Sequence, residues 1–227
     1  MFLIVALTGG AVAQTPSPYC AYTKKLLAIP WVGACPNHIS PSDYPVVHDV
    51  LGESLPPGYS IVYALGPNGD ELGEQNLIML IQEKKQLQLT LSESTPTPEE
   101  YQTFLHHLDQ PGYSNQLLVS SVLPLYNPKT DPVSVKVIQI SKIQSYPAAV
   151  VQFQSYTSLF MWIEQKQAAS RKVITLQLTY VPMKNTAPLD LKQEMASLLE
   201  TPALQQDRLP LSQSILIQKF FAGIHAS

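Results

Sequence analysis

The part of the sequence that most constrains the fold is the stretch from Pro147 to Pro182, which predicts three consecutive β-strands. Its last third alternates apolar and polar residues, with Ile174, Leu176, Leu178 and Tyr180 on one side and Thr175, Gln177 and Thr179 on the other. This period of two is typical of a strand with one buried face and one face in water. The polar side carries hydroxyls and amides and almost no charge. We therefore predict a solvent-facing surface that is suited to being covered by the proline-rich N-terminal segment or by another protein.

Further strands are predicted on both sides of this stretch. Three of them should form a meander, at Tyr59–Leu65, Asn76–Gln82 and Gln86–Leu91. The dipeptide Asn68-Gly69 is a strong turn signal between the first two. Two more strands are expected at Gln116–Leu123 and Val133–Ile143. The apolar phase shifts between Val137 and Ile138, which indicates a β-bulge in the second of these.

Three segments have helical periodicity. The first begins at Thr97-Pro98-Glu99-Glu100, which combines an N-cap threonine, a first-turn proline and an acidic residue at the third position. Its apolar face follows as Tyr101, Phe104, Leu105 and Leu108. A second helix should bury Leu191, Met195, Leu198 and Leu199, and a third should bury Ile217, Phe220, Phe221 and Ile224, with a strand over Ser214–Phe221 as the alternative.

This order of elements predicts an α+β fold. We expect an antiparallel β-sheet of meander strands with two to three amphipathic helices packed on one face and a proline-rich N-terminal arm. A chain of 227 residues can bury a full core in one such domain. We place the sheet domain at residues 59–227.

The N-terminal residues predict export. Residues 1–13 are largely apolar and end in Ala11-Val12-Ala13, which matches a signal-peptide cleavage pattern, so the mature chain would begin at Gln14. This run is too short to span a bilayer, and we expect no transmembrane segment elsewhere. The alternative is a buried N-terminal strand. We predict a secreted or periplasmic protein of a bacterial envelope.

The arm at residues 14–58 contains both cysteines of the chain, Cys20 and Cys35. In an oxidising compartment, a disulfide bond between them is the expected state. A metal site formed by Cys35, His38 and His48 is the alternative, because cysteine and histidine are zinc ligands. We expect no cofactor and no metal in the disulfide-bonded form.

Composition and motifs make several classes of function less favoured. Only 14% of the residues are charged and the net charge is −3, which argues against nucleic-acid binding. The nearest approach to a nucleophile elbow, Gly58-Tyr59-Ser60, lacks the required glycines. A secreted hydrolase would have to use loop acids between Asp43 and Glu53 together with His48.

Aromatic residues are the remaining candidates for recognition, since tyrosine supplies contact area and a hydrogen bond at low entropic cost. The candidate binding residues are Tyr59, Tyr63, Tyr146, Tyr156, Phe220 and Phe221. We predict no catalytic residue. The sequence therefore favours a non-catalytic binding or accessory protein of the cell envelope whose partner is another protein, with the hydrolase and the metal-binding module as alternatives.

Overall fold

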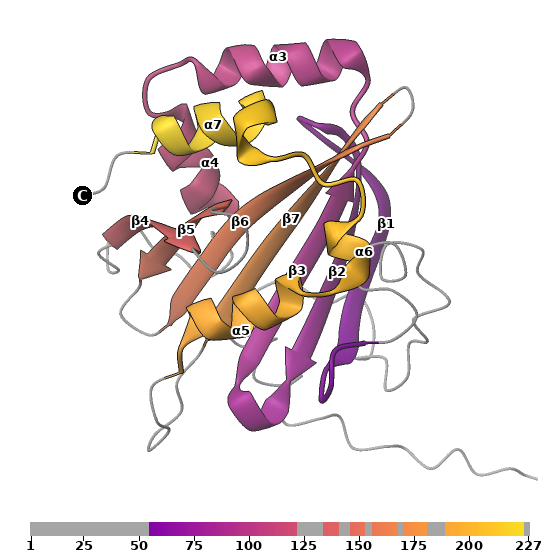
Figure 1. Cartoon of the computed structure of the whole chain (residues 1–227), viewed down its shortest axis with the longest axis vertical. Helices are drawn as coiled ribbons and strands as arrows, with labels where there is room; N and C mark the ends of the chain where they lie inside the picture. Colours follow the sequence, from indigo (N-terminus) through magenta and orange to yellow (C-terminus); the bar gives the residue numbers. More distant parts are fainter. Residues whose placement is uncertain are drawn as a thin grey trace, which may run out of the picture.

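Seven antiparallel strands form one sheet in the order β1-β2-β3-β7-β6-β5-β4 (Figure 1). The computed structural model describes residues 55–121, 134–140, 146–152, 156–167, 170–180 and 189–224. The strands are β1 (Ser60–Asp70), β2 (Gly73–Gln82), β3 (Leu87–Ser94), β4 (Ser134–Ile140), β5 (Tyr146–Gln152), β6 (Thr157–Lys166) and β7 (Arg171–Tyr180). The α+β class, the first meander and the three-strand stretch that ends in β7 are confirmed.

Helices connect and flank these strands. They are α3 (Pro98–Leu108), α4 (Tyr113–Ser121), α5 (Leu191–Leu199), α6 (Pro202–Gln205) and α7 (Ile215–Ala222), with short 3-10 turns η2 (Glu83–Lys85) and η4 (Leu211–Gln213). No helix among the described residues is long and apolar enough to cross a membrane. Both Cys20 and Cys35, and the alternative ligands His38 and His48, lie outside the described residues.

Two meanders meet at the centre of the sheet. Strands β1 to β3 form one and β4 to β7 form the other, and they join where β3 pairs with β7. Leu89 and Leu91 of β3 lie opposite Leu178 and Leu176 of β7, and all four are fully buried. The predicted apolar side of β7 is thus the centre of the core.

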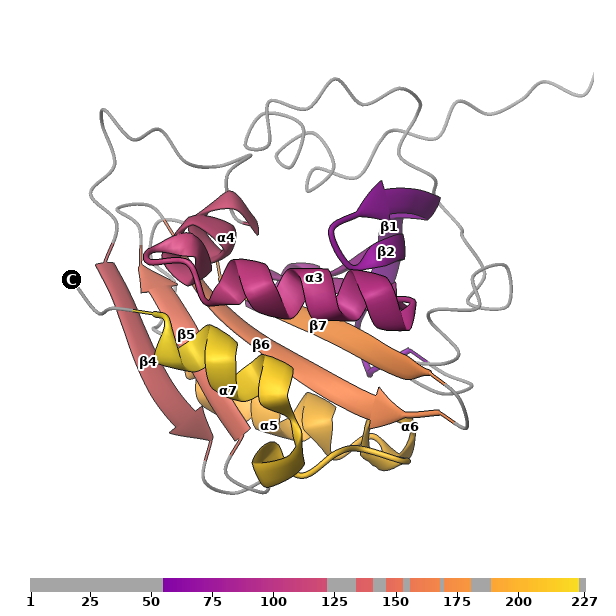
Figure 2. The same cartoon turned by 90° about the horizontal axis from the view of Figure 1, so that it is seen from above.

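Helices cover both faces of the sheet around β6, instead of the single face expected. Phe160 and Trp162 point to one face, where the Trp162 ring lies 4.2 Å from that of Phe220 in α7 and 5.8 Å from that of Phe104 in α3. The alternating Met161 points to the opposite face and is fully buried too. Helix α5 contacts β7, and Figure 2 shows it beyond β6, with α3 and α7 on the near side.

Gln177 and Thr179 on the polar side of β7 are buried and Thr175 is half-buried, so the prediction that this side faces solvent is wrong. Gln177 is 9% exposed and Thr179 only 1%. The Gln177 amide donates to Ser158 Oγ at 3.0 Å, and Ser158 and Thr179 share a hydrogen bond of 2.9 Å. These side chains satisfy one another across β6 and β7, which removes most of the cost of taking them out of water.

The helix at α3 forms as its start signal predicts. Thr97 Oγ1 accepts from the Glu100 backbone N–H at 3.2 Å, and Glu100 Oε2 accepts from the Thr97 N–H at 2.8 Å, which completes a capping box. The apolar faces expected of α3 and α5 are buried. The C-terminal segment is helix α7, so the strand alternative for it is wrong.

Three local predictions are wrong. The expected strand at Gln116–Leu123 is occupied up to Ser121 by helix α4. Asn68 and Gly69 lie within β1, and the turn follows at Glu71 and Leu72, closed by Gly73 with φ +88°. Within its described residues, β4 pairs with β5 in unbroken register, so the bulge expected between Val137 and Ile138 is absent. The irregularities lie in β1 instead, where the pairing shifts twice.

A close approach between α4 and the end of α7 gives a first testable prediction. A Cβ added at Gly223 would lie 2.5 Å from Ser114 Oγ and 3.1 Å from Ser114 Cβ. The residue has φ −81°, so backbone strain is not involved. We expect Gly223→Ala to lower the free energy of unfolding by about 1–3 kcal/mol through overpacking, measured by urea denaturation. Adding Ser114→Ala removes the closest contact and should recover part of this loss; an unchanged loss in the double variant would contradict the steric explanation.

Candidate functional site

A buried carboxylate on β6 joins three elements. Glu164 is 0% exposed. Its Oε1 accepts hydrogen bonds from the Tyr101 hydroxyl of α3 at 2.9 Å and from Arg171 Nη1 of β7 at 2.6 Å. Its Oε2 accepts from Ser214 Oγ, at the N-cap of α7, at 2.5 Å. The charge of Glu164 is therefore paired, and both oxygens are occupied by donors from separate parts of the chain.

The strand register explains why these side chains lie close together. Glu164 continues the side of β6 that carries Phe160 and Trp162, so it points toward α3 and α7. Arg171 pairs with Lys166, which places the guanidinium diagonally across the strand pair from Glu164.

Ser214 has two roles in the cluster, because its hydroxyl donates to Glu164 and also accepts from the Ile217 backbone N–H. It therefore fixes the first turn of α7 relative to the carboxylate on β6.

Electrostatics keep Tyr101 and Arg171 in fixed protonation states at neutral pH. Burial raises the pKa of the Tyr101 hydroxyl, and the nearby Glu164 charge raises it further. The hydrogen bond to Glu164 is the main cause that raises the pKa of Arg171. Tyr101 thus remains a neutral donor and Arg171 a cation, which suits recognition better than proton transfer.

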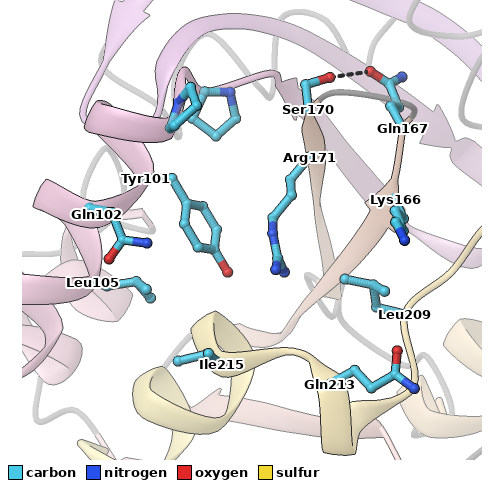
Figure 3. A pocket seen from close by; sticks show the side chains of 12 residues that line it. Tyr101, Gln102, Leu105, Lys166, Gln167, Ser170, Arg171, Leu209, Gln213 and Ile215 are labelled. Atoms are coloured by element: carbon cyan, nitrogen blue, oxygen red, sulfur yellow. Dashed lines mark hydrogen bonds between the residues drawn. The ribbon is translucent and has the colours of Figure 1, made fainter.

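A pocket of about 520 Å³ opens beside this cluster, between α3, the β6–β7 hairpin and the segment that leads into α7 (Figure 3). Its apolar lining consists of Pro96, Pro98, Leu105, Leu209 and Ile215. Its polar lining consists of Gln102, Gln167, Ser170 and Gln213, together with Tyr101, Lys166 and Arg171. Pockets of this size with mixed lining are typical of small-ligand sites.

The charged groups of the pocket are of one sign. Lys166 and Arg171 line it, and none of the lining residues that the structure describes is acidic. The guanidinium carbon of Arg171 lies 5.0 Å from the centre of the Tyr101 ring, so the cation rests on an aromatic face. Figure 3 shows both side chains extending into the pocket. The described lining offers cationic and amide donors for a ligand, and it contains no carboxylate or thiol for acid–base or nucleophilic chemistry.

The aromatic residues proposed from the sequence lie elsewhere. Tyr146, Tyr156 and Phe220 are buried in the core, while Tyr59 and Phe221 are partly buried against it. The side chain of Tyr63 is not among those described. The five whose side chains are described do not line the pocket, and a binding role for all six stays a prediction.

Sequence reasoning missed Glu164, Tyr101 and Ser214 as members of a cluster. One signal was present: Glu164 follows Phe160 and Trp162 on the same side of a strand, and an acid on an apolar side needs a partner. Identifying that partner requires the fold, since Tyr101 and Ser214 are distant in the chain.

Metal binding finds no support in this part of the molecule. No group of three or more histidine, cysteine, aspartate or glutamate residues within the described ranges is placed to hold a metal ion.

The comparisons with known proteins add no relative. No protein-family model matches the chain, and no curated protein sequence matches it.

Proposed function

We propose that this protein is a non-catalytic binding or accessory protein of the cell envelope and that it takes its ligand in the pocket beside Glu164. The observation that supports this proposal most is the burial and full hydrogen bonding of the Glu164 carboxylate. Glu164 is fully buried and accepts hydrogen bonds from Tyr101, Arg171 and Ser214, so its carboxylate holds the surrounding elements together and is not open to a ligand. What the pocket presents to a ligand is a set of donors and apolar surface.

The test measures ligand binding and ligand fate together. The purified protein is screened for thermal stabilisation against a panel of small acids, amines, sugars and peptides, and each hit is recovered and analysed by mass spectrometry. We expect at least one compound to raise Tm and to be recovered unchanged. Conversion of a hit into a product would support the hydrolase alternative instead, and a panel without hits would count against a pocket function.

A blocking variant assigns any binding to this pocket. Gln102 lines the pocket from the exposed surface of α3, so Gln102→Trp should fill part of it and abolish stabilisation by the hits. Gln193 is exposed on α5 and does not line the pocket, so Gln193→Trp is a matched control that should behave as the wild type. Equal loss in both variants would contradict the assignment.

The envelope location in this proposal rests on residues 1–13 and on the two cysteines that follow them. Expression in a bacterial host followed by cell fractionation checks it. We expect the protein in the periplasm or medium as a chain that begins at Gln14, with a mass two hydrogen atoms lower than that of the reduced chain. A full-length cytoplasmic product with free thiols would contradict the export prediction.

A further inference from the structure

We infer that the pocket binds an organic carboxylate with an apolar body, held at its charged end by Lys166 and Arg171. This inference rests on the proposed function, because it names the ligand class of the same pocket. Three features of the pocket support it: the balance of charge, the orientation of Arg171 and the apolar side chains of the lining.

The charge balance comes from the register of the β6–β7 hairpin. Lys166 and Arg171 lie directly opposite each other, so two cations face the same side of the sheet. Like charges in such a pair destabilise a hairpin unless an anion offsets them. Glu164 offsets Arg171 at 2.6 Å, whereas no acidic side chain within the described residues forms an ion pair with Lys166. The pocket therefore has one excess positive charge.

Arg171 is held ready for a ligand. Its Nη1 donates to Glu164, and its guanidinium carbon lies over the Tyr101 ring at 5.0 Å. A guanidinium has five N–H donors, and the bond to Glu164 uses one nitrogen. The fixed fork can present further donors to a carboxylate without first losing rotamer freedom.

One excess charge matches a monoanion. A phosphate monoester carries close to two negative charges at neutral pH, which exceeds the single excess positive charge of this pocket. The described lining of this pocket consists of one lysine, one arginine, a tyrosine, a serine and three glutamines beside its apolar residues. A carboxylate fits the charge of such a pocket.

The apolar side chains of the pocket indicate the chemistry of the rest of the ligand. Leu105 and Leu209 line the pocket, and Ile215 at its edge is 50% exposed, the large hydrophobic side chain most open to water among the described residues. Covering Ile215 with an apolar group would remove this surface from water. A ligand with an aliphatic or aromatic body next to its carboxylate would therefore fill a volume of about 520 Å³ better than a small inorganic anion.

The same chemistry has two sources, a free organic acid and the C-terminal carboxylate of a peptide. The probes are hexanoate and acetyl-alanyl-leucine with a free carboxylate, each compared with its neutral amide, and hexylamine as the cationic counterpart. Binding is measured by isothermal titration calorimetry or NMR titration with the wild-type protein. We expect each acid to bind at least about 10-fold more tightly than its amide. The acid that binds more tightly identifies the source of the ligand.

Lys166→Gln is the decisive variant, because Lys166 is exposed and its loss leaves the Glu164–Arg171 pair in place. We expect affinity for the acids to fall about 10-fold while affinity for the amides changes less than about 2-fold. Lys192→Gln makes the same charge change on the exposed surface of α5, outside the pocket, and should leave both affinities within about 2-fold of the wild type.

The outcomes separate the two proposals. Amides or hexylamine that bind as tightly as the acids, or acids that bind equally to Lys166→Gln and wild type, would overturn the carboxylate inference. If Gln102→Trp abolishes the binding of such neutral or cationic ligands, the proposal that the pocket binds a ligand still stands. If no probe and no compound of the wider panel binds in a way that Gln102→Trp abolishes, both proposals fail.

Discussion

Replacing Glu164 with alanine should lower the free energy of unfolding by about 3–5 kcal/mol. The Glu164 side of its ion pair with Arg171 is fully buried, whereas the Arg171 side chain is 38% exposed. Removing the buried partner of such a pair is more costly than losing an exposed pair. Here the change also removes the acceptor of the Tyr101 and Ser214 hydroxyls. Glu164→Gln keeps the shape and one acceptor oxygen, so its cost should be smaller, about 1.5–3 kcal/mol. Urea denaturation followed by circular dichroism measures both.

Asp109→Ala is the matched control. Asp109 forms an ion pair with Lys219 at 2.5 Å, which also joins α3 to α7, but the Asp109 side chain is 54% exposed. Such pairs contribute about 0–1 kcal/mol. A loss in Glu164→Ala no larger than in Asp109→Ala would show that the buried cluster does not hold the three elements together.

Phe220→Ala should cost about 3–5 kcal/mol by the same measurement, as expected when a fully buried phenylalanine leaves a cavity. The Phe220 ring lies 4.2 Å from Trp162 and 5.6 Å from Phe160, so its removal opens the layer between α7 and β6. Phe220→Leu keeps most of the volume and should cost less than about 1.5 kcal/mol.

Phe221 provides the comparison on the same helix. It is only partly buried and packs edge-on against Phe220, with ring centres 5.0 Å apart. Phe221→Ala should therefore be clearly milder than Phe220→Ala. Equal effects of the two changes, or a stable Phe220→Ala protein, would favour a role for Phe220 outside the core.

Local patterns predicted the elements that depend on local chemistry. The Thr97-Pro98-Glu99-Glu100 start signal acts within one turn, and the capping box forms as expected. Alternation in β7 correctly identified a strand, because the side-chain period of two is a property of extended backbone.

The same alternation could not show what lies above each face. Thr179 is polar and therefore read as exposed, yet it is 1% exposed and bonded to Ser158 on the neighbouring strand. A polar side chain is as compatible with a buried hydrogen-bond network as with water. The distinction depends on a partner that only the fold supplies.

Two other failures have identifiable physical causes. The segment that begins at Gln116 is a short apolar run, which periodicity cannot assign to helix or strand. The segment forms helix α4, and its Leu118 is fully buried. The Asn68-Gly69 turn signal was overridden because irregular pairing in β1 extends the strand to Asp70, so the turn lies at Glu71 and Leu72.

The pocket was beyond sequence reasoning for a related reason. Its charged end comes from the β6–β7 hairpin, whose residues are neighbours in sequence, but Tyr101 and Ile215 come from helices far away in the chain. An arginine on a predicted strand does not reveal that it will lie over a distant tyrosine.

The central pairing of β3 with β7 has a consequence for how the chain must fold. Ser94 lies opposite Val173, so forming this pair closes a loop of roughly eighty residues, whereas each meander needs mainly local contacts. During synthesis, β3 therefore keeps an unpaired edge until β7 has been made. Such an edge is a template for pairing with other chains. We expect refolding to be limited by closure of this central pair, and aggregation to begin from the open edge of β3.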